Sequence, residues 1–369
     1  MLSDALANHL AAVLPDDAPP FALAFSGGGD SLSLLARLQD HPRLKAVLHV
    51  DHGLRDMSAK EAALARLMAA QFWHDAIILA WNPEMPPKTG LQEKARKARY
   101  KLMGDYCRCH GIEQLVTAHH ADDQAETVMM RLDRATGWRG AAGMRLRHYG
   151  AVWPELAGIT LVRPALAFDQ STLHAVGGVG QAIRDPSNHD DRFERVRVRR
   201  LLRAKPELKT DMIALATDMR SGLKRERTHR LKQMDGYHLT HEGLLRIPRL
   251  VDVPTLCALA PIIGGQAGPA QRNRVEAKAV QLSTRTRVAI GQGCLAKWDG
   301  ATLTLSRDPV AMTGRSDGNL APSAERQEIG PEPVVWDGRF LIRGTAGIIQ
   351  PERRGHHVGF RIFYGRDVR

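Results

Sequence analysis

The stretch FALAFSGGGDSLSLLARL, residues 21–38, decides how the chain begins to fold. The apolar residues 21–25 are typical of a buried strand, and the pattern of residues 31–40 is typical of a helix. Gly27, Gly28 and Gly29 form the turn between them. Backbone N–H groups in such a turn, together with the N-terminus of the following helix, make a concave anion site. The stretch therefore predicts a phosphate-binding loop.

This loop lacks the lysine of the usual nucleotide-binding loop, and Asp30 and Ser31 stand there instead. The hydroxyl groups of Ser26 and Ser31 can donate hydrogen bonds to phosphate oxygens. Asp30 beside a triphosphate would serve a Mg²⁺ ion or cap the helix. A loop without lysine is poorly suited to transfer of the γ-phosphoryl group and suits a pyrophosphate that leaves. An ordinary strand-to-helix turn is the alternative interpretation.

Strands and helices alternate outward from this loop. Further strands are predicted at 45–55, 75–81 and 112–123, and helices at 58–73, 90–110 and 122–134. This alternation predicts right-handed βαβ units and a parallel sheet covered by helices on both faces. Ligands bind at the carboxyl ends of such strands. Three polar clusters lie there, SGGGDS (26–31), DHGLR (51–55) and AHHADD (118–123), so we expect one site at that edge.

The charge of the chain is strongly positive and unevenly distributed. The 369 residues carry a formal net charge of +12, and residues 192–234 hold 14 lysines and arginines against 5 acidic residues, a net +9. This stretch has a helical pattern. A solvated helix face is one interpretation, but such concentration favours a nucleic-acid footprint.

The remaining composition bounds the class of protein. The four cysteines form no CxxC pair, so neither a disulfide framework nor a zinc site is predicted. No apolar run reaches 18 residues, and the N-terminus lacks the basic start of a signal peptide. We therefore expect a soluble, cytoplasmic protein with no membrane partner. Residues 137–191 are looser and rich in glycine, 308–333 are expected to form a loop, and short apolar runs from 236 predict a smaller β-rich or α+β domain.

The motifs resemble those of a known family. SGGGDS resembles the SGGxDS signature of the N-type ATP pyrophosphatases, the PP-loop superfamily, which cleave ATP to AMP and pyrophosphate and adenylylate an oxygen. HVDHGLR (49–55), ARKARY (95–100), the string 118–144 and DPSN (185–188) before an arginine-rich helix follow in order. Together they make residues 20–205 similar to tRNA(Ile)-lysidine synthases. The resemblance implies an α/β fold with a parallel Rossmann-like sheet of the adenine nucleotide alpha hydrolase type.

The resemblance also implies a reaction. The C2 oxygen of the wobble cytidine in tRNA(Ile) with a CAU anticodon attacks the α-phosphorus of ATP, and Mg²⁺ accompanies the ATP. The ε-amine of free L-lysine then displaces AMP, so the base becomes lysidine and the tRNA reads AUA. We expect a catalytic domain at 1–205, a basic helical linker at 206–235 and a C-terminal tRNA-recognition domain at 236–369. A homodimer is compatible with the sequence.

Site residues are carried over from the motifs. For ATP binding the resemblance implies Ser26, Gly27, Gly28, Gly29, Asp30, Ser31, Asp51 and His52, with Asp30 as a Mg²⁺ ligand. For catalysis it implies Asp30, Arg99, His119 and Asp123. For free lysine it implies Asp123 and Glu126, and for tRNA it implies Arg195 and Arg199. The family loop before the basic helix corresponds to Asp185, Ser187 and Asn188.

The residues themselves support part of this assignment. Asp123 and Glu126 are three apart and would share one helix face, where carboxylates can bind amino groups. Asp122 can share it too, although helix capping is the alternative role for Asp122 and Asp123. We expect a structural role for His120, and stacking on RNA or plain packing for Trp138 and Arg139. The sequence departs from the family pattern at two positions, Val196 in place of asparagine and Gln92 in place of glutamate.

Three other functions are alternatives to lysidine synthesis. A tRNA thiolase of the same fold is the nearest, but sulfur chemistry usually needs a cysteine pair, and no cysteine lies in a strand-end motif. An RNA-binding protein with an inactive nucleotide fold would have lost the SGGxDS loop or the acidic pair, and both are intact. A glutamine amidotransferase would need a glutaminase domain, which the sequence does not reveal.

Overall fold

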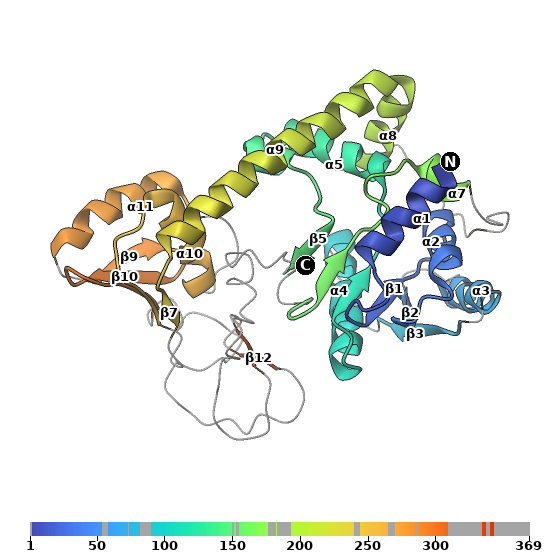
Figure 1. Cartoon of the computed structure of the whole chain (residues 1–369), viewed down its shortest axis with the longest axis horizontal. Coiled ribbons are helices and arrows are strands. Elements are labelled where there is room, and N and C mark those ends of the chain that lie inside the picture. Colours follow the sequence, from blue (N-terminus) through green and yellow to red (C-terminus); the bar gives the residue numbers. More distant parts are fainter. Residues whose placement is uncertain are drawn as a thin grey trace. The chain divides into compact units, whose positions relative to one another are not determined.

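The computed structural model describes the following residues: 2–53, 58–72, 74–81, 90–149, 151–152, 155–175, 182, 193–239, 244–264, 270–284, 287–308, 334–336 and 340–342. The chain forms two compact units, residues 1–224 and 225–369. The boundary lies within α9 (Pro206–Gln233), which is one continuous helix (Figure 1). The division predicted at residues 205 and 235 stays a prediction.

The first unit is built from alternating strands and helices, as the sequence predicted. Its elements are α1 (Leu2–Val13), β1 (Phe21–Ala24), α2 (Gly29–Leu38), β2 (Leu44–Asp51), α3 (Ser58–Ala70), β3 (Ala76–Ala80), α4 (Leu91–Cys109), β4 (Gln114–Val116), α5 (Ala121–Asp133), α6 (Gly137–Ala141), β5 (Arg147–Tyr149), β6 (Thr160–Val162), α7 (Gln170–His174), α8 (Glu194–Ala204) and the start of α9.

The six strands form one mostly parallel sheet in the order β3-β2-β1-β4-β6-β5. The five strands from β3 to β6 pair in parallel, and β5 is an antiparallel edge strand. This confirms the predicted α/β class. The sequence did not reveal β5 and β6, which have three residues each and lie in the glycine-rich stretch 137–191, where no longer apolar run marks a strand. The chain order reverses between β1 and β4, where doubly wound sheets bind ligands.

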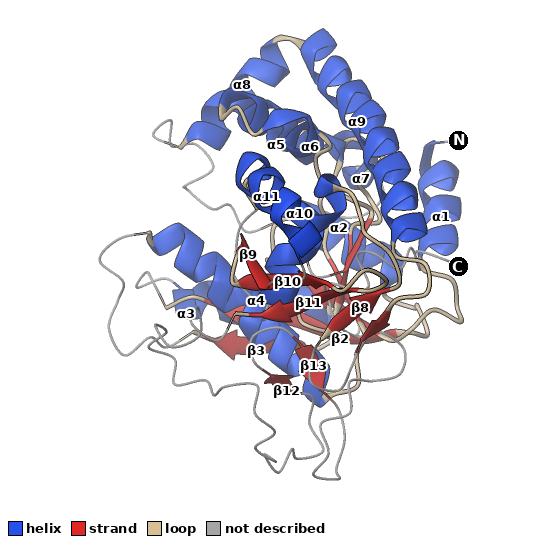
Figure 2. Cartoon of the chain, turned by 90° about the vertical axis from the view of Figure 1, so that its left-hand side faces the viewer, coloured by secondary structure: helices blue, strands red, loops and turns tan. Residues whose placement is uncertain are grey.

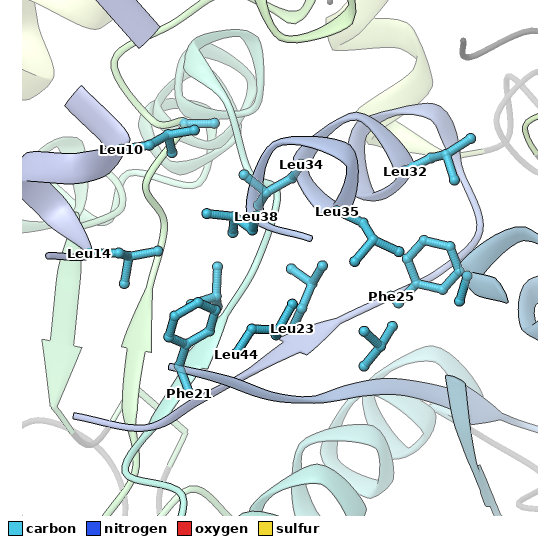
Figure 3. Close-up of a cluster of buried hydrophobic side chains, with 14 of the residues drawn as sticks. Leu10, Leu14, Phe21, Leu23, Phe25, Leu32, Leu34, Leu35, Leu38 and Leu44 are labelled. Atoms are coloured by element: carbon cyan, nitrogen blue, oxygen red, sulfur yellow. The ribbon is translucent and has the colours of Figure 1, made fainter. Parts of the chain in front are cut away.

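Alternate residues of β1 supply the two cores of this unit. Phe21 and Leu23 face the helices α1, α2 and α3, whereas Ala22 faces Tyr100 and Met103 of α4. Figure 3 shows Leu34, Leu35 and Leu38 of α2 above Phe21 and Leu23. Leu34 and Leu35 are fully buried, and each such side chain contributes about 1.5–3 kcal/mol. This packing fixes the start of α2, and therefore the phosphate loop, over the end of β1.

The second unit is a smaller α+β domain, as predicted. Five antiparallel strands lie in the order β7-β8-β11-β10-β9, with bounds β7 (His238–Leu239), β8 (Leu245–Ile247), β9 (Arg287–Gly291), β10 (Cys294–Trp298) and β11 (Leu303–Arg307). The helices α10 (Val253–Gly264) and α11 (Arg272–Ala279) pack on this sheet, followed by the 3-10 helix η3 (Val280–Thr284) (Figure 2). A hairpin of β12 (Val334–Trp336) and β13 (Phe340–Ile342) follows. The loop predicted at 308–333 lies outside the described residues from 309 on.

None of the helices in the described ranges is long and apolar enough to cross a bilayer.

Candidate active site

A cavity of about 450 Å³ opens at the carboxyl ends of β1, β2 and β4. β1 pairs with β2 on one side and β4 on the other, so the segments that follow these strands meet there. Most of the predicted site residues line it: Ser26, Asp30, Ser31, Asp51, His52, Arg99, His119 and Asp123. Gly27, Gly28 and Gly29 belong to the same loop. Three predicted residues do not line the cavity and form ion pairs with one another: Glu126, Arg195 and Arg199.

The phosphate loop, residues 26–31, is held in shape by its two serines. The buried Ser31 Oγ accepts the Ser26 N–H at 3.2 Å and donates to the Gly28 carbonyl at 3.0 Å. Ser26 Oγ accepts the Gly28 N–H at 3.2 Å. Gly27 has a φ of 76°, which favours glycine. The glycine turn is therefore set before any ligand arrives, as an anion-binding nest requires.

Asp30 is anchored by the short helix α7. Its Oδ1 accepts hydrogen bonds from Gln170 Nε2 at 2.9 Å and from His174 Nε2 at 2.7 Å. Burial would raise the pKa of Asp30, but the nearby imidazole of His120 and the hydrogen bonds from Gln170 and His174 outweigh burial and lower that pKa below its usual range. The carboxylate is therefore anionic at neutral pH and is still 38% exposed in the cavity wall.

His120 lies at the centre of three carboxylates. Its imidazole is 4% exposed, and its nitrogens lie 3.7 Å from Asp30 Oδ2, 3.4 Å from Asp122 Oδ2 and 3.5 Å from Asp123 Oδ2. Burial opposes its charge, yet the nearby carboxylates of Asp122, Asp30 and Asp123 raise the pKa of His120 to about 10. The resulting imidazolium joins the phosphate loop to the start of α5. Sequence reasoning expected only an unspecified structural role here.

Another part of the cavity wall combines the guanidinium group of Arg99 with the neutral imidazole of His119. Burial, followed by the charges of Arg163 and Arg195, lowers the pKa of His119 well below its usual value, and its Nδ1 lies 2.8 Å from Thr117 Oγ1. Burial also lowers the pKa of Arg99 and, together with Arg99, lowers that of His52 to about 4. Within the described part of the chain no carboxylate pairs with Arg99. This wall is suited to an anion.

Glu126 is enclosed by the two arginines predicted to bind tRNA. Its carboxylate is 3% exposed and accepts Arg195 Nε at 3.0 Å, Arg199 Nε at 2.6 Å and Arg199 Nη2 at 3.2 Å. It does not line the cavity. Arg195 and Arg199 thus lie on the inner face of α8, whereas Arg197 and Arg200 are exposed on its outer face.

A series of polar contacts connects α9 to Asp30 of the phosphate loop. Lys209 Nζ lies 2.6 Å from Asp122 Oδ1 and 2.9 Å from Asp169 Oδ1. Asp122 Oδ2 accepts the Gln170 N–H at 2.9 Å, and the Gln170 side chain donates to Asp30. The basic helix therefore contacts the site through a continuous series of hydrogen bonds. The sequence spacing had made Asp122 a candidate to bind free lysine. In the structure its carboxylate instead pairs with Lys209 of the protein itself.

The segment after α5 is fixed by two side chains. Gln124 bonds both the N–H and the carbonyl of Met144, and Arg131 donates to the carbonyls of Gly140 and Gly143. Trp138 is 40% exposed on this segment, with the Arg139 guanidinium 4.9 Å from its ring. Asp185, Ser187, Asn188 and the side chain of Gln92 lie outside the described residues.

The residues around the cavity limit which metal ion or sulfur chemistry it can support. In the ranges that the structure describes, no group of three His, Cys, Asp or Glu residues is arranged to hold a metal ion. Asp30 is an ionised oxygen donor in the cavity wall, which fits a Mg²⁺ ion held mainly by nucleotide phosphates. None of the four cysteines lines the cavity.

Comparison with known proteins gives consistent similarities. The PP-loop domain family matches residues 2–205. A tRNA(Ile)-lysidine synthase of Methylobacterium nodulans is 35% identical over 81% of this chain and 94% of its own length. One from Ruegeria pomeroyi is 32% identical over 92% of this chain and 80% of its own. A solved U34-tRNA thiolase of Methanococcus maripaludis has a TM-score of 0.47 at 15% identity, covering 59% of this chain and 79% of that chain.

Proposed function

We infer that the chain, which belongs to the tRNA(Ile)-lysidine synthase family of PP-loop proteins, joins free L-lysine to C2 of the wobble cytidine of tRNA(Ile). It is a ligase that forms a C–N bond while ATP becomes AMP and pyrophosphate. One observation carries this proposal: the phosphate loop, Arg99, His119 and Asp123 line a single cavity at the switch point of the sheet. The anticodon CAU and the use of lysine are part of the proposal.

In the first step the phosphate loop binds the phosphates of ATP, with Asp51 and His52 on the nucleotide side. The C2 oxygen of the cytidine attacks the α-phosphorus, and pyrophosphate leaves. Arg99 stabilises the negative charge that develops at the phosphorus, since it is a half-buried cation in the cavity wall without a carboxylate partner in the described residues. His119 is neutral, so it can contact the base without repelling Arg99.

In the second step the ε-amine of lysine attacks C2 of the adenylylated base, and AMP leaves. We assign the ammonium and amine contacts to Asp123, which lines the cavity, with Glu126 behind it on the same helix. Mg²⁺, held by Asp30 and the phosphates, would supply charge neutralisation for the triphosphate. Arg195 and Arg199 remain our proposal for tRNA contact, through their partly exposed guanidinium groups.

Where the reaction takes place and in what assembly are also proposals. ATP, free lysine and tRNA occur together in the cytoplasm, so we place the enzyme there, and a homodimer stays a prediction. The thiolase alternative is not favoured, because no cysteine lies in the cavity wall.

The direct test is incorporation of radiolabelled lysine into unmodified tRNA(Ile) with a CAU anticodon, in the presence of ATP and Mg²⁺. We expect ATP-dependent label that resists mild alkali, because an aminoacyl ester would be hydrolysed. tRNA(Met) and a variant of the tRNA(Ile) with uridine at the wobble position are the controls and should stay unlabelled. Absence of label with a folded, tRNA-binding protein would contradict lysine as the nucleophile, and sulfur transfer would be tested next.

Replacing Lys209 by methionine should slow pyrophosphate release more than it weakens substrate binding. The change removes the ammonium that holds Asp122 and Asp169, and thereby loosens the positioning of Asp30. We expect kcat to fall about 10–100-fold, since small misplacements near reacting groups cost rates of this order. The KM for ATP and the Kd for tRNA should change less than about threefold.

Two further variants separate positioning from charge. Lys205→Met removes the same charge from the exposed end of α8 and should leave kcat near the wild-type value. Lys209→Arg keeps a cation between the two carboxylates and should recover most of the rate. Equal loss in Lys209→Met and Lys205→Met would show that only overall charge matters.

A further inference from the structure

A row of five residues crosses the whole sheet of the second unit in register. His238 of β7 pairs with Arg246 of β8, and Arg246 pairs with Thr304 of β11. Thr304 pairs with Lys297 of β10, and Lys297 pairs with Arg287 of β9. Residues directly opposite each other in antiparallel strands project from the same face. We call these five residues the basic row.

The basic row projects from the face of this sheet opposite α10 and α11. His238, Arg246, Lys297 and Arg287 are exposed, and Thr304 is half-buried. Their neighbours along the strands, such as Leu245, Ile247, Val288, Ala296 and Leu305, are buried on the face that α10 and α11 cover. The period-two pattern of these strands therefore places the core on one side and the cations on the other.

Ordinary solubility does not account for this arrangement. Charges on an edge strand prevent edge-to-edge pairing, which explains Arg287 on β9. Arg246 and Lys297, however, lie on the interior strands β8 and β10. Lys297 is directly opposite Arg287, and like charges in that position destabilise a sheet. A polar face that only needed solvation would alternate the signs of its charges.

Within the described residues one carboxylate acts on the row, that of Asp299, whose pKa is lowered mainly by backbone N–H groups and also by the charge of Lys297. Among the described residues none of its five positions is acidic. The nearest carboxylate along β10 is Asp299, in the turn after the strand, where it accepts the N–H groups of Ala301 at 2.9 Å and Thr302 at 2.8 Å. The row thus presents three permanent cations, Arg246, Lys297 and Arg287, on one face of the sheet, and this charge is complementary to a polyanion.

We propose that the basic row binds the sugar-phosphate backbone of the RNA substrate, an inference that rests on the proposed function. Adjacent strands lie about 4.8 Å apart, so the row extends about 19 Å, enough for several consecutive phosphates. Thr304 at its centre adds a hydroxyl donor. Contacts of this kind position an RNA without reading its sequence.

The test is tRNA binding by the full chain, without ATP or lysine, as a function of salt. In a triple variant, Arg246→Gln, Lys297→Gln and Arg287→Gln, the Kd for unmodified tRNA at 0.1 M salt should rise about tenfold or more. The slope of log K against log salt should become shallower by about 2, since each lost phosphate contact removes about 0.7–0.9. Thermal stability should stay the same or rise, because a like-charge pair is removed.

Matched variants make the test specific. Arg272→Gln with Arg274→Gln removes two exposed cations from α11 in the same unit and should leave the slope within about 0.5 of wild type. The swap Arg246→Lys, Lys297→Arg and Arg287→Lys keeps every charge and should bind like wild type. The proposal is overturned if the triple variant binds within about twofold of wild type, if the α11 variant loses as much, or if the swap loses as much.

Lysine incorporation by the same proteins separates the two proposals. If the wild-type protein incorporates lysine but the triple variant binds tRNA as well as wild type does, the proposal for the basic row is wrong and the ligase function stands. If the triple variant loses tRNA binding but no protein incorporates lysine, the proposal for the basic row stands and the ligase function is wrong.

Discussion

Replacement of Asp30 by asparagine is expected to reduce pyrophosphate release from ATP about 1000-fold, the scale of losing a preorganised charge at a reacting phosphate. Asparagine keeps the shape and can still accept the bonds from Gln170 and His174. It removes the negative charge, so His120 loses one of its three carboxylates and the Mg²⁺ ion loses its proposed protein ligand. We expect the protein to stay folded, because Asp122 and Asp123 still flank His120.

The measurement is pyrophosphate release with saturating tRNA and lysine, followed at several Mg²⁺ concentrations. The matched control is Asp75→Asn, which removes an equally negative side chain that is 71% exposed and pairs with Arg66 away from the cavity. That control should match wild type, since exposed pairs of this kind contribute about 0–1 kcal/mol. A rate for Asp30→Asn within about tenfold of wild type would exclude the assigned role of Asp30 in the ATP step.

The sequence predicts those site residues that follow a recognisable strand, and it misses contacts between residues far apart along the chain. The phosphate loop, Asp51, His52, His119 and Asp123 each follow a strand with a clear apolar pattern, so parallel alternation was enough to bring them to one edge. Arg99 came from the family motif alone. Its place in the cavity wall depends on α4 packing under the sheet, which no local pattern reveals.

The unpredicted parts depend on contacts between distant segments. His174 is 144 positions from Asp30, and Lys209 is 87 positions from Asp122. α7 has only five residues, too few to show helical periodicity, so the element that anchors Asp30 had no signal in the sequence. His120 had a partial signal in the adjacent Asp122 and Asp123, but its contact with Asp30 required the pairing of β1 with β4.

Glu126 is the residue for which motif and geometry differ most. The motif assigns it to lysine, together with Asp123, whereas the structure encloses its carboxylate between Arg195 and Arg199. A buried carboxylate that neutralises two guanidinium groups has a large effect on stability when it is removed, since the cations are left uncompensated. Asp123 differs because its cationic partner, His120, also has Asp30 and Asp122 beside it, and its own hydrogen bond is to the backbone N–H of His120 at 3.2 Å.

The two residues should therefore respond differently to neutralisation. For Glu126→Gln we expect the free energy of unfolding to fall by about 2–3 kcal/mol, at the lower end for a buried pair because both arginines are partly exposed. For Asp123→Asn we expect a loss of at most about 1 kcal/mol from weakened capping. Its KM for lysine should rise about tenfold or more, the scale of one lost charge-assisted hydrogen bond.

Denaturant unfolding and lysine titration of both variants check this difference, and a double-mutant cycle isolates its cause. Combined with Arg195→Gln and Arg199→Gln, Glu126→Gln should cost little more stability, because the arginines no longer need a partner. Arg197→Gln with Arg200→Gln is the matched control on the exposed face of α8 and should show no coupling to Glu126. Unchanged stability with a raised lysine KM in Glu126→Gln would instead place its carboxylate on the substrate, and the arginine pair would then be what lysine displaces.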